Sequence, residues 1–238
     1  VLLNFHGNGG TADDHLRDAD MRGIAEEDNV ILIYPQGSIL EGEGSHWNPL
    51  VESENNKSDA DDFGFVAAIL DELSTNYRID ASRVYATRYS NGAWLVYGLA
   101  CYLSDRIAAF APVSGSMYIE MQDNCNASHP SSIAIFNGTL DAVRPFDGYP
   151  GFLLPVDDAA SFWTAHNNIS DPATTDRFES NGLTIERDAY SGGTAGTRVH
   201  RYKVIGGDHV WFDINIDGSD LNRIIWDFVS QYDVDGLR

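Results

Sequence analysis

Short apolar runs alternate with stretches of helical spacing along this 238-residue chain. Five of the runs are continuous, as expected for strands buried on both faces: 1–5, 30–35, 84–87, 107–113 and 132–136. The segments 13–27 and 61–73 instead place apolar side chains at helical spacing. Strands that alternate with helices indicate a mostly parallel sheet with helices on both faces. The sequence therefore predicts an α/β fold, in which functional sites lie beyond the carboxyl ends of the strands.

The segment 84–103 has the layout of a nucleophile elbow. A β-branched and aromatic run leads into a polar turn that contains Ser90, and a helical run begins after Gly92. Such a turn lifts a serine Oγ above the edge of a parallel sheet, and the glycine lets strand and helix pack closely. The usual Gly-x-Ser-x-Gly pattern is incomplete, because Arg88 replaces its first glycine. We expect the Arg88 side chain to leave the turn toward water or an acidic neighbour, so that the elbow geometry survives.

Ser90 has candidate partners further along the chain. A serine hydroxyl needs a base to take its proton, normally a histidine held by a carboxylate. Asp141 and His209 each follow a strand-like run, in the chain order that elbow-type hydrolases use. Alone, each residue would be explained as a turn former or a buried structural histidine. Their joint position past strand ends, which His6 shares, predicts a catalytic site.

The charge of the chain limits its possible partners. It carries 36 acidic and 15 basic residues, a formal net charge of −21. Nucleic acid and anionic membrane surfaces repel such a protein, so neither is an expected partner. No apolar run reaches the ~18 residues of a membrane span. The length of the chain is typical of a single domain, 1–238. The sequence does not indicate an oligomeric state.

No metal or organic cofactor is expected. The stretch 213–218 matches the first half of a calcium loop, but Ile224 stands where such a loop requires a bidentate Glu. Cys101 and Cys125 do not have a metal-binding spacing. From the residues alone they are either two buried thiols or one disulfide.

Eight short stretches carry a family resemblance. They are 6–10 (HGNGG), 34–37 (YPQG), 47–48 (WN), 61–65 (DDFGF), 90–93 (SNGA), 111–115 (APVSG), 137–141 (NGTLD) and 209–211 (HVW). In these stretches the chain resembles the esterase family of α/β-hydrolases that includes polyhydroxybutyrate depolymerase-like proteins, feruloyl esterases and acetylxylan esterases. The resemblance implies one α/β-hydrolase catalytic domain over 1–238. Because Val1 opens directly in a strand, we expect the first strands of that fold to be missing.

The resemblance also assigns roles to residues. Ser90 would be the nucleophile, His209 the general base and acid, and Asp141 the residue that orients His209. The backbone N–H groups of Asn8 and Asn91 would form the oxyanion hole, a contribution of about 3 kcal/mol per donor. The role implied for His6, which is outside this set, is to orient the glycine loop.

Three aromatic residues are candidates for substrate binding: Trp47, Tyr89 and Trp211. Trp47 lies alone in a long polar loop, 36–59. It resembles an aromatic side chain beside the acyl or alcohol pocket, and the alternative is an anchor for that loop. Relatives carry cysteines in the segments around Cys101 and Cys125 and are secreted. The resemblance therefore implies a disulfide and an extracellular location.

The predicted function is that of a serine carboxylesterase without cofactors. Its expected substrates are short acyl esters or esters of the polyhydroxybutyrate and polyester type. A first alternative is a feruloyl or acetylxylan esterase that acts on plant polysaccharide. A second is a catalytically disabled hydrolase-like module that binds a polymer, with Arg88 as the mark of a damaged elbow.

Overall fold

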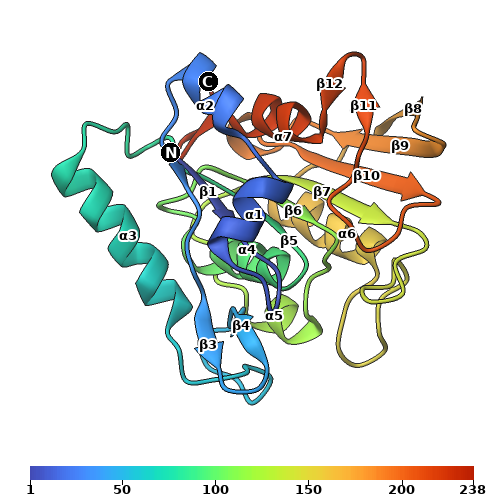
Figure 1. Ribbon diagram of the computed structural model, residues 1–238. Coiled ribbons are helices and arrows are strands. Elements are labelled where there is room, and N and C mark those ends of the chain that lie inside the picture. Colours follow the sequence, from blue (N-terminus) through green and yellow to red (C-terminus); the bar gives the residue numbers. More distant parts are fainter.

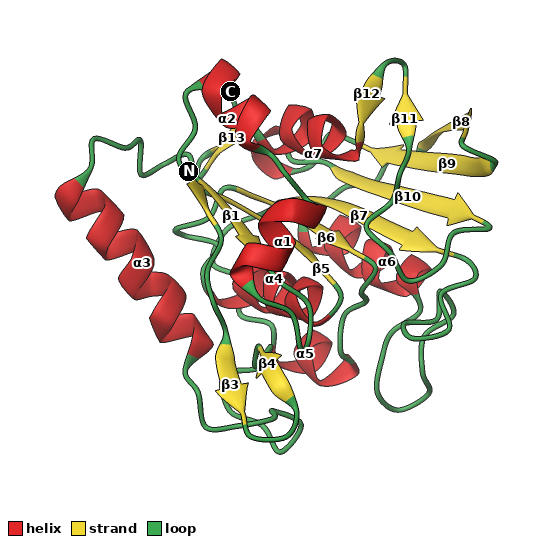
Figure 2. Cartoon of the chain, viewed as in Figure 1, coloured by secondary structure: helices red, strands yellow, loops and turns green.

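The computed structural model describes residues 1–238 and is built around an eight-stranded sheet (Figures 1 and 2). Its strands are β1 (Leu2–Phe5), β2 (Leu32–Ile33), β5 (Tyr85–Tyr89), β6 (Ala109–Val113), β7 (Ser132–Gly138), β8 (Thr174–Ser180), β9 (Leu183–Tyr190) and β10 (Val199–Ile205). They lie in the order β2-β1-β5-β6-β7-β10-β9-β8. The strands from β2 to β10 are parallel, whereas β9 and β8 are antiparallel to their neighbours. The predicted, mostly parallel α/β sheet is confirmed.

Seven α-helices and three small ribbons surround the sheet. The helices are α1 (Ala12–Asp18), α2 (Arg22–Asp28), α3 (Asp62–Asn76), α4 (Asn91–Tyr102), α5 (Ile119–Asn124), α6 (Val156–His166) and α7 (Leu221–Val229), with one 3-10 turn, η1 (Thr194–Gly196). The ribbons pair β3 (Ser38–Leu40) with β4 (Gly44–His46), β11 (Asn215–Ile216) with β12 (Ser219–Asp220), and β13 (Tyr232–Asp233) with β14 (Gly236–Leu237). None of the helices combines the length and apolar character needed to cross a bilayer.

Apolar side chains form one core on each face of the sheet. Leu3 and Phe5 of β1 point into a core of 31 buried residues, which α3, α4, α5 and α6 also supply. Leu2 and Tyr85 point to the opposite face, into a core of 23 buried residues shared with α7 and with Ile24 of α2. Because strand side chains alternate between faces, these continuous apolar strands fill both cores. Helices therefore cover both faces, as predicted.

Two expected elements differ from the prediction. The segment 13–27 forms two helices rather than one, because the chain turns between them, where the Tyr34 hydroxyl donates to the Ala19 carbonyl at 2.7 Å. The run 30–35 does not form a strand buried on both faces. Only Leu32 and Ile33 pair with β1, and both are half-buried because β2 is the edge of the sheet.

The parallel strands bring the functional loops to one edge. β1 ends at Phe5, β5 at Tyr89, β7 at Gly138 and β10 at Ile205. Each is followed within four residues by a candidate site residue or its glycine loop. Because carboxyl ends of parallel strands meet at the same edge, the loops after β1, β5, β7 and β10 lie together there.

Candidate active site

Ser90 occupies a sharp turn between β5 and α4. Its backbone has φ 59° and ψ −123°, a left-handed conformation that is uncommon for a residue other than glycine. The Ser90 N–H donates to the Val113 carbonyl at 3.0 Å, which fixes the turn to the end of β6. Strained backbone of this kind persists only where the surroundings hold it and is frequent at active sites. The turn therefore has the geometry expected of a nucleophile elbow.

Ser90, His209 and Asp141 lie in one chain of polar contacts. The His209 Nε2 is 2.9 Å from the Ser90 Oγ, and its Nδ1 is 2.7 Å from the Asp141 Oδ2. The other Asp141 oxygen accepts hydrogen bonds from the N–H groups of Val143 and Arg144, at 2.9 and 2.6 Å. The Asp141 side chain is fully shielded from solvent. With Nδ1–H donating to Asp141, the Nε2 lone pair faces the serine hydroxyl, which suits a general base.

Tyr89 supports the loop that carries His209. Its hydroxyl donates to the His209 carbonyl at 2.7 Å, and the two rings lie 4.9 Å apart. Ser114 donates from its hydroxyl to the next carbonyl, that of Val210, at 2.8 Å. Two side chains from neighbouring strand ends thus hold the histidine loop in place over the elbow.

The two candidate oxyanion donors border the cleft beside Ser90. Asn91 is the first residue of α4, and a helix leaves its first N–H groups without intrahelical partners. Asn8 lies in the turn after β1, where the Gly9 N–H donates to Ser45 and the Gly10 N–H donates to Gly7. Both asparagines line the cleft that contains Ser90.

His6 holds the glycine loop rather than facing the cleft. Its Nε2 accepts the Gly37 N–H at 2.8 Å, and its Nδ1 lies 2.8 Å from the Gly7 carbonyl. Burial lowers the pKa of His6 to about 4, so the ring is neutral near pH 7. A neutral ring with the proton on Nδ1 satisfies both contacts. This placement agrees with an orienting role.

The expectation for the Arg88 side chain is wrong. Arg88 is 0% exposed, and none of its three guanidinium nitrogens has a hydrogen-bond partner. The side chain runs over the space left by two glycines. A Cβ at Gly92 would lie 2.1 Å from its Cγ, and a Cβ at Gly7 would lie 2.9 Å from its Nη2. Burial holds the pKa of the guanidinium well below its usual value. The elbow nevertheless keeps Ser90 in contact with His209.

A cleft of about 330 Å³ opens over the elbow. Its walls come from the glycine loop, the long loop, the elbow and the loops after β7 and β10: Gly7, Asn8, Lys57, Tyr89, Ser90, Asn91, Trp94, Val143, Arg144 and His209. Of the three aromatic candidates for substrate binding, Tyr89 is in this set.

Trp47 and Trp211 lie outside the cleft, in contrast to the expectation. Trp47 is 0% exposed, and its indole N–H donates to the His6 carbonyl at 3.0 Å. Its backbone forms a pair of hydrogen bonds, 2.8 and 3.0 Å, with the Asn91 side chain. Trp47 therefore anchors the long loop to the elbow, which is the alternative to a substrate-binding role. The indole N–H of Trp211 donates to Asn222 at 3.1 Å in a separate pocket.

Four cleft residues had no signal in the sequence: Lys57, Trp94, Val143 and Arg144. The Lys57 Nζ donates to the Asn8 side-chain carbonyl at 2.7 Å, a contact between residues 49 positions apart. The Arg144 guanidinium lies over the Trp94 ring, 3.8 Å from its centroid. Both contacts depend on the way in which the long loops fold over the edge of the sheet. Short-range sequence patterns could therefore not predict them.

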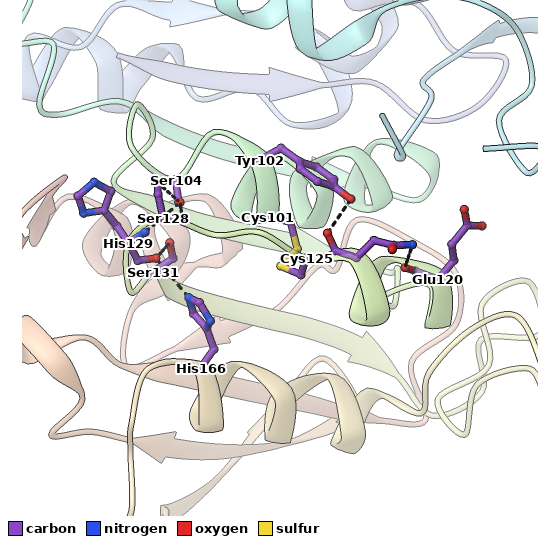
Figure 3. The surroundings of a disulfide bond; sticks show 10 residues. Cys101, Tyr102, Ser104, Glu120, Cys125, Ser128, His129, Ser131 and His166 are labelled. Atoms are coloured by element: carbon purple, nitrogen blue, oxygen red, sulfur yellow. Dashed lines mark hydrogen bonds between the residues drawn. A yellow bond between two sulfur atoms is a disulfide. The ribbon is translucent and has the colours of Figure 1, made fainter. Parts of the chain in front are cut away.

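A disulfide joins Cys101 near the end of α4 to Cys125 just after α5 (Figure 3). The pairing implied by the family resemblance is therefore present. Beside it, the Tyr102 hydroxyl donates to the Asn124 carbonyl at 3.2 Å. The bridge fastens the α5 region to the helix that follows the elbow.

No protein-family model matches the chain. Among curated proteins, the putative esterase NocK of Nocardia uniformis subsp. tsuyamanensis is 30% identical over 231 residues, 89% of this chain and 65% of that protein. Feruloyl esterase B of Piromyces equi is 28% identical over 247 residues, 98% of this chain and 42% of that protein. The chain thus spans less than two thirds of either relative.

The solved structures include an acetyl xylan esterase from Aspergillus awamori. It superposes with a TM-score of 0.66 at 16% identity and covers 88% of this chain and 83% of its own. At that identity the likeness shows the fold, and it agrees with the mostly parallel sheet described above. The chain therefore has the α/β-hydrolase fold, and its resemblance to esterases, predicted from the motifs, is confirmed.

Proposed function

We propose that this protein is a serine carboxylesterase with Ser90 as nucleophile, His209 as general base and acid, and Asp141 as the residue that orients His209. The observation that carries the proposal is the Ser90–His209–Asp141 chain, with contacts of 2.9 and 2.7 Å, at the carboxyl edge of the sheet. Its relatives named as esterases support the same reaction class.

In the acylation step, the Ser90 Oγ attacks the ester carbonyl carbon while the His209 Nε2 takes the hydroxyl proton. The charge that develops on the carbonyl oxygen is stabilised by the N–H groups of Asn8 and Asn91. His209 then gives its proton to the leaving alcohol, the carbon–oxygen bond breaks, and the acyl group stays on Ser90.

In the deacylation step, a water molecule replaces the alcohol. The His209 Nε2 takes a proton from this water, whose oxygen attacks the acyl carbon. The tetrahedral intermediate uses the same oxyanion donors, and its collapse returns the proton to the Ser90 Oγ and releases the acid. Besides the ester and this water, the proposed cycle uses only groups of the protein itself.

The substrates we propose are short acyl esters and ends of polyester chains, with feruloyl or acetyl esters of plant polysaccharide as the alternative. The small cleft over Ser90, about 330 Å³, supports short acyl groups. The alternative is supported by the relatives, one named feruloyl esterase B and one named acetyl xylan esterase.

We also propose that residues 1–238 act as one catalytic domain and that the protein is extracellular. The shared central sheet supports a single unit. The Cys101–Cys125 disulfide supports an oxidising compartment, because such bonds are rare in the reducing cytosol.

Covalent labelling with a fluorophosphonate tests the proposal. We expect the purified protein to be labelled at Ser90 and to hydrolyse p-nitrophenyl acetate and butyrate. In Ser90→Ala both properties should be lost, with kcat reduced at least about 10⁴-fold. A matched control is Ser161→Ala on α6, which should be labelled and active. A folded wild-type protein that is neither labelled nor active would instead support the disabled, polymer-binding module.

A further inference from the structure

The cleft over Ser90 reverses the charge of the rest of the molecule. The chain has 36 acidic and 15 basic residues, a formal charge of −21. Among the ten residues that line the cleft, however, Lys57 and Arg144 are cationic and none is Asp or Glu. Lys57 is one of only two lysines in the sequence. Because acidic residues outnumber basic ones by more than two to one in the chain, a cleft of average composition would instead contain carboxylates.

Lys57 stands on the oxyanion side of the cleft. Its Nζ donates to the Asn8 side chain at 2.7 Å and lies 3.6 Å from Glu43, whose side chain is 58% exposed. An ion pair of that length with an exposed carboxylate is weak in water. An ammonium carries three donors, so the contact to Asn8 leaves Lys57 able to bind a further anion in the cleft.

Arg144 stands on the Asp141 side of the cleft. Its guanidinium lies on the Trp94 ring at 3.8 Å, and its Nη1 donates to the Val143 carbonyl at 2.7 Å. The Arg144 Nε is buried without a hydrogen-bond partner, and the side chain forms no ion pair. Burial lowers the pKa of Arg144. The nearby Asp141 carboxylate offsets part of this cost, but its oxygens are bound to His209 and to two backbone N–H groups and form no ion pair with Arg144.

We propose that Lys57 and Arg144 form a recognition site for a carboxylate carried by the substrate, so that the enzyme prefers esters with a negatively charged group close to the scissile bond. This inference rests on the proposed esterase function. A planar guanidinium held on an aromatic ring presents donors that match a carboxylate. The carboxylate can belong to the acid part of the ester or to its alcohol part.

The net charge of −21 does not contradict this preference. At physiological ionic strength, charges farther apart than about 8 Å are largely screened. Contacts inside the partly enclosed cleft are screened much less. Remote carboxylates therefore affect how fast an anionic ester approaches, whereas Lys57 and Arg144 act on it once it is bound. Measurements at 0.15 M NaCl therefore report mainly the contribution of Lys57 and Arg144 to the preference for anionic esters.

Matched pairs of esters test the inference, each pair differing only by a carboxylate against its neutral amide. For the acid part, the pair is the mono-p-nitrophenyl ester of glutaric acid and that of its monoamide. For the alcohol part, the pair is para-acetoxybenzoate and para-acetoxybenzamide. The readout is the ratio of kcat/KM for the charged ester to that for the neutral one, after subtraction of the uncatalysed rate.

We expect a ratio of at least about tenfold in one of the two pairs, as one charge-assisted contact would give. Arg144→Gln and Lys57→Gln should each lower that ratio several-fold, and the double variant should bring it near one. Arg144→Lys keeps the charge but not the planar fork, so it should retain part of the ratio. The control Arg177→Gln removes a cation that is 63% exposed on β8 and should leave the ratio unchanged.

The two pairs also separate the two sources of the carboxylate. A high ratio for the glutarate pair places the charge on the acid part, and one for the benzoate pair places it on the alcohol part. Ratios near one in both pairs, with good turnover of the neutral esters, would overturn the inference and leave the esterase proposal standing. No turnover of any ester, together with no fluorophosphonate labelling, would instead refute both.

Discussion

At the scale of single residues, the least expected feature is a buried arginine in the elbow. Arg88 takes the place of a glycine, and its side chain fills space that Gly92 and Gly7 leave open. The guanidinium has no ion pair or hydrogen bond inside the protein. The guanidinium carbon lies over the Tyr89 ring, 5.4 Å from the ring centroid. A buried charge without a partner is costly, so the elbow keeps its geometry at the expense of stability.

This packing predicts that Gly92 cannot become alanine while Arg88 is present. In a helix, glycine to alanine normally stabilises a protein by about 0.5–1 kcal/mol. At position 92 the new Cβ would lie 2.1 Å from the Arg88 Cγ, and such overpacking costs about 1–3 kcal/mol. We expect Gly92→Ala to be destabilised in urea unfolding, whereas in the Arg88→Gly background the same change should be neutral or stabilising.

A control on another helix isolates the effect. A Cβ at Gly23 in α2 would have nothing within 4 Å, so Gly23→Ala should be stabilising with either residue at position 88. The coupling between positions 88 and 92 should reach at least about 1 kcal/mol, and that between 88 and 23 should be near zero. Equal effects of Gly92→Ala in both backgrounds would contradict the packing described here.

The grouping of Ser90, Asp141 and His209 at one edge of the sheet could be predicted because each follows a strand. Ser90, Asp141 and His209 need only the local pattern of a buried run, a turn and the correct residue type. The burial of Arg88 does not follow from the local sequence, because it depends on two glycines, one of which, Gly7, is 81 positions away. Lys57 and Arg144 carried no local pattern at all, since their place in the cleft is set by loops.

At the scale of elements, the long loop before α3 is clamped to the body of the protein at Asn48. The Asn48 side chain donates to the carbonyls of Ser58 and Ala60, at 2.8 and 2.9 Å. Its backbone N–H donates to the Asp62 carboxylate at 2.6 Å. The adjacent Trp47 is bound by Asn91, the residue after Ser90. The clamp therefore connects the start of α3 with the elbow.

The Asp62 carboxylate makes this clamp sensitive to pH. Burial raises the pKa of Asp62 to about 6, above its usual value of about 3.9. Between these values the folded protein holds a proton that the unfolded chain releases, so this group's contribution to stability falls as pH rises. Asp62→Asn removes the titration. The free energy of unfolding of Asp62→Asn, measured relative to that of wild type, should therefore increase by up to about 3 kcal/mol between pH 4 and pH 7.5.

Urea unfolding at both pH values provides the measurement. Asp59→Asn is the matched control, because Asp59 is an exposed acid in the same loop. The difference in the free energy of unfolding between Asp59→Asn and wild type should be the same at both pH values. A difference between Asp62→Asn and wild type that does not change with pH would show that Asp62 titrates normally in the folded state.

The disulfide gives a second prediction for an element. It closes a segment of 24 residues between α4 and the end of α5. Cross-links of that span stabilise a protein by about 3 kcal/mol, chiefly by restricting the unfolded chain. We expect Cys101→Ala/Cys125→Ala to lose about this amount, and reduction of the wild-type protein to cause a similar loss. Two alkylatable thiols in the unreduced wild-type protein would exclude the bond.

Elements buried at the centre of the sheet were the most predictable. β5, β6 and β7 are buried almost throughout and therefore have mainly apolar sequences, with Arg88 of β5 as the main exception. The edges gave weaker signals. β2 pairs through only two residues although its apolar run is longer, and β8 is a mostly exposed, polar strand that no apolar run marks. Edge strands are half-solvated, so their sequences reflect burial less directly.

At the scale of the whole molecule, the dominant property is a net charge of −21. Repulsion among surface carboxylates opposes the compact state. It acts over about 30 Å at 0.01 M salt but over about 8 Å at 0.15 M. The unfolded chain spreads the same charges farther apart, so screening stabilises the folded protein more than the unfolded one.

We therefore expect the melting temperature to rise by at least about 3 °C between 0.01 and 0.15 M NaCl, which corresponds to about 1 kcal/mol for a chain of this size. A charge-reduced variant is the control. Glu41, Glu52, Glu54 and Asp123 are exposed acids outside the ion pairs of the protein, and replacing them with amides changes the formal charge from −21 to −17. Its melting temperature should depend less on salt and lie above that of wild type at 0.01 M. A wild-type melting temperature independent of NaCl would mean that opposite charges already balance the repulsion locally.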